Sequence, residues 1–161
     1  MISIQINDVK NFMKKLLLSD TFDQFDMQHG LVTTYNTFEV DGLINKAFFG
    51  DEIESTPLYG HTHTPWSTMR EYFYSVIKGK HTPLSFKFIL YIEGDQVNEI
   101  ISGASMDAQS NTQALVLNIR YDDHGLILTT GIATHTFLLD KSAEEIWDKW
   151  VSLFLGQNAL D

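Results

Sequence analysis

The segment ALVLNIRYDDHGLILTTGI, residues 114–132, carries the clearest fold signal of this chain. In its first half every second residue is apolar, which is the period of a strand with one buried face: Leu115, Leu117 and Ile119. The run Asp122–Gly125 then supplies the residue types that a tight turn prefers. We expect the chain to return as a second strand over residues 126–140. The segment therefore predicts an antiparallel hairpin.

The N-terminal part repeats this mixture of alternation and turn residues. Three isoleucines alternate at the start and predict a strand: Ile2, Ile4 and Ile6. A helix capped by Asn7 or Asp8 should follow, because apolar residues recur on one helical face: Val9, Phe12, Met13, Leu16 and Leu17. A hairpin with strands near residues 25–36 and 38–47 is then expected, with Asp41-Gly42 in a turn.

Two longer helices are predicted beyond these hairpins. Pro65 at a first helical position and Gly79 after the last apolar residue bound a bridging helix over residues 65–78. Ser142 and Glu145 have the spacing of a capping box and begin a C-terminal helix over residues 142–155.

The segments between these helices complete the predicted order of elements. A buried strand over residues 84–92 and a short helix near Val97 are expected from their apolar residues. Residues 49–64 and 103–112 are rich in turn formers and are expected to be loops. The sequence therefore predicts an α+β fold with antiparallel sheets.

Composition limits the class of protein. The 161 residues include 43% hydrophobic residues, as expected for a single globular domain spanning residues 1–161. No apolar run approaches the roughly 20 residues that a membrane helix needs. There is no cysteine, and the start does not resemble a signal peptide, so we expect a cytoplasmic protein. A net charge of -10 opposes unspecific binding to nucleic acid.

Two segments of the chain share the order of their predicted elements. Residues 1–48 and 84–140 each read as a β-α-β-β unit, which suggests an internal duplication joined by the bridging helix. This order resembles that of a domain of the DNA sliding clamps, which implies assembly into a ring. The predicted second helix departs from that likeness, because its polar residues offer no positive charge to a phosphate backbone: Gln96, Asn98 and Glu99.

His61 and His63 are the most suggestive candidates for a metal site. Imidazoles two residues apart on an extended segment point to the same side and can share a divalent metal ion. A complete site would need further ligands from nearby in the sequence, for which the candidates are Asp51, Glu52, Glu54 and His81. The two histidines therefore suggest a metal-dependent hydrolase, with a pair of exposed loop histidines as the alternative.

Four positive side chains suggest an anion or nucleic-acid site: Arg70, Lys78, Lys80 and Lys87. The alternative is structural, because lysines at a helix C-terminus also complement the helix dipole.

Several runs resemble an uncharacterised bacterial family catalogued as a domain of unknown function: Asn7–Leu18, Tyr35–Gly42, Ile77–Lys87 and Thr129–Gly131. The resemblance covers nearly the whole chain, implies no activity, and leaves His61 and His81 outside its pattern. No nucleophile elbow, phosphate-binding glycine loop or dinucleotide fingerprint is present. We therefore expect a non-catalytic binding or assembly protein without a cofactor, which associates with a protein partner or with itself through its sheet edges or the helices of Trp66 and Trp147.

Overall fold

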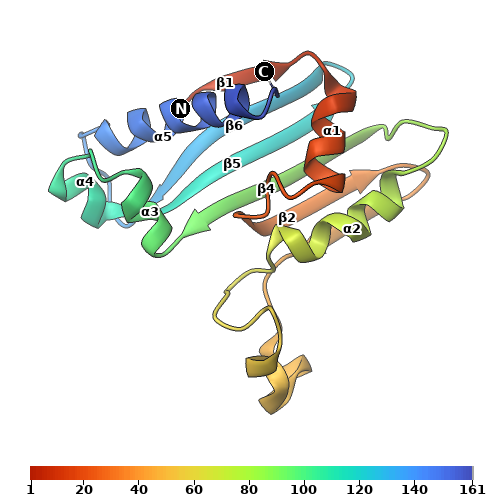
Figure 1. The fold of residues 1–161 in the computed structure, drawn as a ribbon, viewed down its shortest axis with the longest axis horizontal. Coiled ribbons are helices and arrows are strands. Elements are labelled where there is room, and N and C mark those ends of the chain that lie inside the picture. Colours follow the sequence, from red (N-terminus) through yellow and green to blue (C-terminus); the bar gives the residue numbers. More distant parts are fainter. Residues whose placement is uncertain (161) are drawn as a thin grey trace.

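The computed structural model describes residues 1–160, which form one six-stranded antiparallel sheet beside a layer of helices (Figure 1). The strands follow the order β1-β6-β5-β4-β2-β3. Their bounds are β1 Ser3–Ile6, β2 Asp26–Thr33, β3 Thr37–Asp41, β4 Ser85–Glu93, β5 Thr112–Asp122 and β6 Gly125–Thr134. The predicted α+β class is confirmed, and the expected separate sheet regions join in one sheet because β2 pairs with β4.

The hairpin of residues 114–132 forms two neighbouring inner strands of the sheet, β5 and β6. β5 and β6 pair in register from Asp122 opposite Gly125 to Leu117 opposite Thr130. Gly125 adopts a positive φ of 106°, which a residue with a side chain rarely tolerates. The return strand ends at Thr134 and does not reach residue 140 as predicted.

The longer helices α1 Val9–Leu18, α2 Trp66–Ile77 and α5 Ser142–Gln157 lie on one face of the sheet (Figure 1). Asp8 caps α1 as predicted, accepting a 3.0 Å hydrogen bond from the Asn11 amide. The predicted capping box of α5 is wrong. Ser142 is already helical, and its amide donates to the Asp140 carboxylate, while its hydroxyl accepts from the Ser105 amide.

The core between sheet and helices is rich in aromatic side chains. Trp66 and Trp147 are both fully buried, and their indole N–H groups donate to the carbonyls of Leu16 and Val116. Trp150 is partly buried and stacks on Trp147 with ring centroids 5.1 Å apart. These indole rings therefore hold the fold together. A partner that contacts the helices of Trp66 and Trp147 cannot touch these two buried rings.

The opposite face of the sheet carries a different set of side chains. Alternation along each strand directs one residue in two away from the helices. On β4 and β5 these residues include Lys87, Ile89, Asn118 and Arg120. Among residues 1–160 the three longer helices leave this face uncovered (Figure 1).

Both expected loops contain helical turns. In residues 103–112 the short helix α4 Met106–Asn111 forms, because the Ser105 hydroxyl caps the Ala108 amide and Ala108 is buried. It follows α3 Asp95–Ile100. In residues 49–64 the chain forms the 3-10 turn η2 Gly50–Ser55, and a second such turn, η1 Lys46–Phe48, directly precedes this segment. Within residues 1–160 no helix has the length and apolarity that a membrane crossing requires.

The suggested duplication stays a prediction. The two proposed units contribute strands that interleave in the sheet, since β1 pairs with β6 while β2 and β3 lie at the other end. The edge strand β1 has 4 residues, whereas its proposed counterpart β4 has 9 and is central.

Candidate functional site

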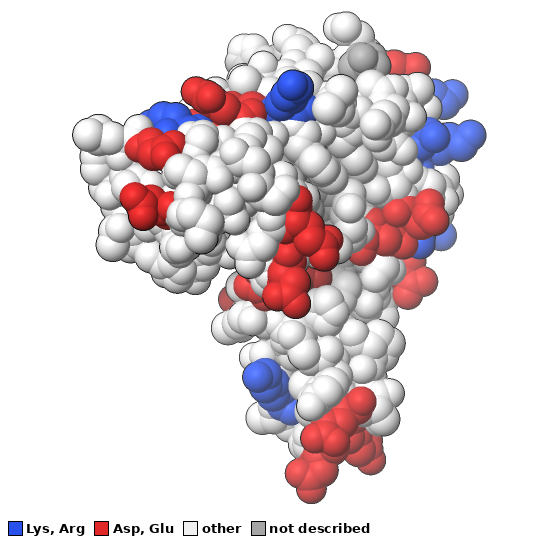
Figure 2. Space-filling view, turned by 60° about the vertical axis from the view of Figure 1, so that its left-hand side comes forward, with Lys and Arg blue, Asp and Glu red and all other residues white. Residues whose placement is uncertain are grey.

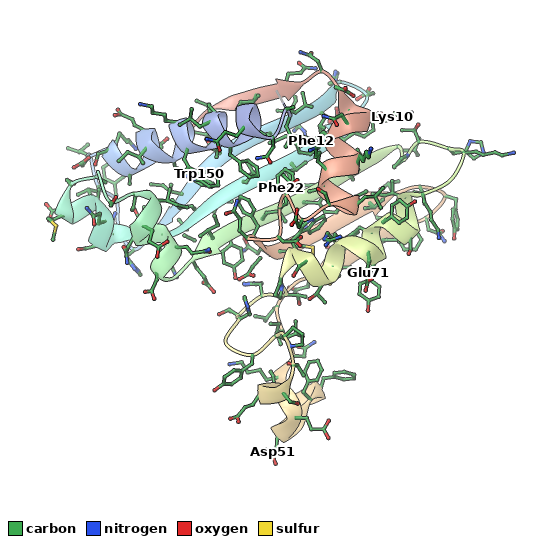
Figure 3. All side chains as sticks on the ribbon, in the orientation of Figure 1. Lys10, Phe12, Phe22, Asp51, Glu71 and Trp150 are labelled. Carbon is green, nitrogen blue, oxygen red and sulfur yellow. The ribbon has the colours of Figure 1, made fainter. Side chains whose placement is uncertain are left out.

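An arm formed by residues 43–64 projects from the body of the molecule (Figure 1). It connects β3 to α2 and carries η1 and η2. The label of Asp51 marks its tip, far from the sheet (Figure 3). The arm contains the predicted metal ligands His61 and His63, which makes it a candidate binding site.

Backbone hydrogen bonds join the two ends of the arm to each other and to β2. Within the base the Ile44 amide donates to the Thr62 carbonyl, and the Thr64 amide donates to the Gly42 carbonyl. The Met27 amide donates to Thr64 at 2.9 Å, which ties the base to the sheet. Gly42 has no room for a side chain, because a Cβ there would lie 1.8 Å from the Met27 carbonyl oxygen.

The two histidines of the arm bind to separate partners in the sheet. His61 Nδ1 lies 3.1 Å from the carboxylate of Asp26. His63 Nδ1 lies 2.5 Å from the phenol oxygen of Tyr91. Asp26 and Tyr91 are paired residues of β2 and β4, so both contacts reach the same spot on the sheet. The histidines therefore anchor the arm.

Tyr91 has the perturbed ionisation expected of a buried phenol. Its side chain is buried although it points away from the core, because the base of the arm covers it. Burial raises its pKa above the ordinary value, and the nearby carboxylates of Glu93 and Asp26 raise it further. The phenol is therefore protonated throughout the neutral range and can act as a hydrogen-bond donor.

The acidic residues expected to complete a metal site lie elsewhere on the arm. Asp51, Glu52 and Glu54 belong to η2, whereas His61 and His63 lie at the base. In the described residues no group of three or more His, Asp or Glu side chains is arranged to hold a metal ion. The metal site stays a prediction. A polar hollow of about 380 Å³ next to His61 is lined by Asp26, Tyr91 and Glu93.

The outer part of the arm exposes large apolar side chains between acidic ones. Phe48 is 83% exposed and Tyr59 is 59% exposed. Phe48 packs edge-on against Phe49, with ring centroids 5.1 Å apart. Figure 2 shows acidic side chains gathered at the tip, and η2 contributes Asp51, Glu52 and Glu54. Aromatic side chains are enriched in the surfaces through which proteins bind one another.

A second hollow lies where α2 ends. We call it the lysine hollow; it is lined by residues of the β2–β3 turn and of the segment after α2, including Tyr35, Val76, Ile77, Lys78, Lys80 and Leu84. Its volume is about 480 Å³. Most of its surface is apolar, and the two lysines among its lining residues are both exposed.

The four predicted anion-binding residues do not form one patch. Arg70 pairs with Asp23 through two hydrogen bonds of 2.9 and 3.2 Å, so its charge is already balanced. Lys78 and Lys80 share the lysine hollow. Lys87 lies on the helix-free face of the sheet and faces Arg120 of β5. The residues of the predicted anion site therefore lie at three separate places on the surface.

Lys87 and Arg120 line a hollow of about 310 Å³ with the polar residues Ser3, Asn118 and Thr129. Directly opposed like charges destabilise a strand pair. Asp122 lies 3.4 Å from Arg120 and balances part of that charge. Arg120 was missed by sequence reasoning, because its neighbour Lys87 lies on another strand.

Sequence reasoning also missed the exposed aromatic side chains of the arm. The signal that could have found them is the combination of Phe48, Phe49 and Tyr59 with acidic residues in a stretch otherwise typical of loops. Apolar residues in such a stretch have no helix or strand face to bury them.

The comparisons with known proteins bear on the family alone. No curated protein and no solved structure matches this sequence. The sequence matches a family of unknown function over residues 15–161, a range that includes the arm and the lysine hollow. The chain belongs to this family, DUF5721.

Proposed function

We propose that this chain is a non-catalytic binding and assembly protein, and that its arm docks onto a second copy of the chain. The observation that carries the proposal is the projecting arm, whose outer aromatic residues Phe48 and Tyr59 are exposed. Apolar side chains held away from the body gain free energy when a partner removes them from water.

The anchoring of the arm supports this proposal. The contacts of His61 with Asp26 and of His63 with Tyr91 fix its base, and backbone hydrogen bonds add to them. A segment that is already ordered loses less conformational entropy when it binds. The arm therefore has both the exposed surface and the order that a docking element needs.

Sedimentation velocity over a range of concentrations tests the proposal. We expect the natural protein to associate as its concentration rises into the hundreds of micromolar. The double variant Phe48→Ser/Tyr59→Ser should remain monomeric. The matched control Tyr72→Ser/Phe137→Ser, which also removes one exposed tyrosine and one exposed phenylalanine, should associate as the natural protein does.

Two results would contradict the proposal. One is a natural protein that is monomeric at every concentration. The other is association that the arm variant leaves unchanged. Circular dichroism of both double variants checks that they keep the fold, which is expected because all four side chains are largely exposed.

Lys87 and Arg120 are two positive side chains on facing positions of β4 and β5, and they favour a second candidate function, the binding of a small anion such as phosphate. Two adjacent cations beside the polar groups of Asn118 and Thr129 offer the donors that an anion takes up. The net charge of -10 disfavours an extended nucleic acid at the same place.

A further inference from the structure

We infer that the surface which receives the arm is the lysine hollow of the second copy. This inference rests on the proposed function, because it names the partner surface for the same arm. In this contact Phe48 and Tyr59 of the arm meet the apolar residues of the hollow. The acidic residues of η2 meet its two lysines.

The apolar parts of the two surfaces fit this assignment. The hollow is about 480 Å³, within the usual range of binding pockets of about 300–1,000 Å³. Leu84 is 71% exposed and Tyr35 is 88% exposed, so both sides present apolar groups to water. Contact between them would bury aromatic and aliphatic surface on each copy.

The charges of the two surfaces are opposite. The chain has 21 acidic against 11 basic residues, and the lysine hollow combines two exposed lysines with apolar lining residues. Within residues 1–160 the recorded ion pairs include neither Lys78 nor Lys80, nor any acidic residue of η2. Complementary charges of this kind steer association and set its register.

The direction of the arm makes the contact one between molecules. Its tip, marked by Asp51, points away from the sheet, whereas the lysine hollow lies at the end of α2 (Figures 1 and 3). The arm and the hollow are different surfaces, so each copy offers one of each. Two copies that exchange arms form a closed symmetric pair, whereas a one-way contact leaves one arm and one hollow free and produces a ring or a filament.

Charge exchange between the two surfaces tests the inference. The variant Glu52→Lys/Glu54→Lys places lysines on both the arm and the hollow. The variant Lys78→Glu/Lys80→Glu places acidic residues on both. Each variant alone should sediment as a monomer, because like charges meet at the contact. An equimolar mixture should associate, because every arm again meets a hollow of opposite charge.

The mixture excludes unspecific attraction as a cause. The net charges become about -6 and about -14, by adding or subtracting 4 from -10, so the two variants repel each other over their surfaces as a whole. The variant Lys10→Glu/Lys14→Glu is the matched control, because it changes the charge by the same amount at exposed positions of α1. It should associate as the natural protein does. Rising salt should weaken association.

The outcomes separate the two proposals. If the arm variant Phe48→Ser/Tyr59→Ser is monomeric but Lys78→Glu/Lys80→Glu still associates, the arm docks elsewhere, and this inference is wrong while the proposed function stands. If the natural protein never associates, both fail. If the mixture stays monomeric although each charge variant is folded, the pairing of arm and hollow is also refuted.

Discussion

The phenol oxygen of Tyr91 lies 2.5 Å from Nδ1 of His63 and joins the centre of the sheet to the base of the arm. The ring of His63 also meets the ring of Tyr91 edge-on, with centroids 5.2 Å apart. The phenol is buried, and its contact with this imidazole supplies a hydrogen-bond partner that water supplies to an exposed tyrosine. Tyr91 and His63 therefore couple the stability of the fold to the placement of the arm.

Replacement of Tyr91 by phenylalanine should lower the free energy of unfolding by about 1–2 kcal/mol, because it removes a buried hydrogen bond and leaves His63 Nδ1 without its partner. Urea denaturation followed by circular dichroism measures this loss. Tyr72→Phe, at a 60% exposed position, should change the same quantity very little. Equal stability of Tyr91→Phe and the natural protein would show that the contact contributes nothing.

The pH dependence at alkaline pH should also come partly from Tyr91. Its pKa is raised in the folded protein, so the unfolded chain loses this proton first as the pH rises past its ordinary value of 10.0. The contribution of protonated Tyr91 to the free energy of unfolding is therefore fully present below about pH 10. It is lost as the pH rises toward the pKa of the folded protein, by at most about 1.4 kcal/mol per pH unit. Tyr91→Phe should lack this part of the loss. Unfolding curves of both proteins between neutral pH and pH 11 measure the difference, and parallel losses would contradict it.

The elements that sequence patterns predicted well are those whose signals are local. Residues 114–132 form the expected hairpin because alternation and turn residues act over a few positions. Asp8 caps α1 because the amide it needs is only three residues away.

What the patterns could not predict depends on distant partners. Asp26 and Tyr91 contact the two histidines across 35 and 28 positions of the chain, whereas the ligands expected for them were acidic residues nearby in the sequence. Ser142 has the spacing of a capping residue, but Ser105, 37 positions away, engages its hydroxyl. The projection of the arm away from the sheet likewise follows from how the strands join, which no local pattern contains.

Gly42 should be indispensable for the placement of the arm. A methyl group there would lie 1.8 Å from the Met27 carbonyl oxygen, so the base of the arm or β2 must shift. We expect Gly42→Ala to lower the free energy of unfolding by about 1–3 kcal/mol. It should also weaken association in sedimentation velocity. Gly131→Ala is the control, because a methyl group at Gly131 meets nothing within 4 Å. A Gly42→Ala protein as stable as Gly131→Ala would contradict the expected clash.

Lys87 should respond to anions in a way that Lys10 does not. At low ionic strength Lys87→Met should raise the free energy of unfolding by about 0.2–1 kcal/mol, because it removes the like charge opposite Arg120. Phosphate should raise the melting temperature of the natural protein, since a ligand of the folded state alone stabilises it. The same addition should have little effect on Lys87→Met.

Chloride at equal ionic strength separates binding from screening, because it weakens the repulsion between Lys87 and Arg120 without the several acceptor oxygens of phosphate. Lys10→Met, at an exposed position of α1, should respond to phosphate as the natural protein does. If phosphate and chloride stabilise the natural protein equally, only screening is at work, and the hollow beside Asn118 holds no anion. A stabilisation by phosphate that survives in Lys87→Met would place the anion at another site.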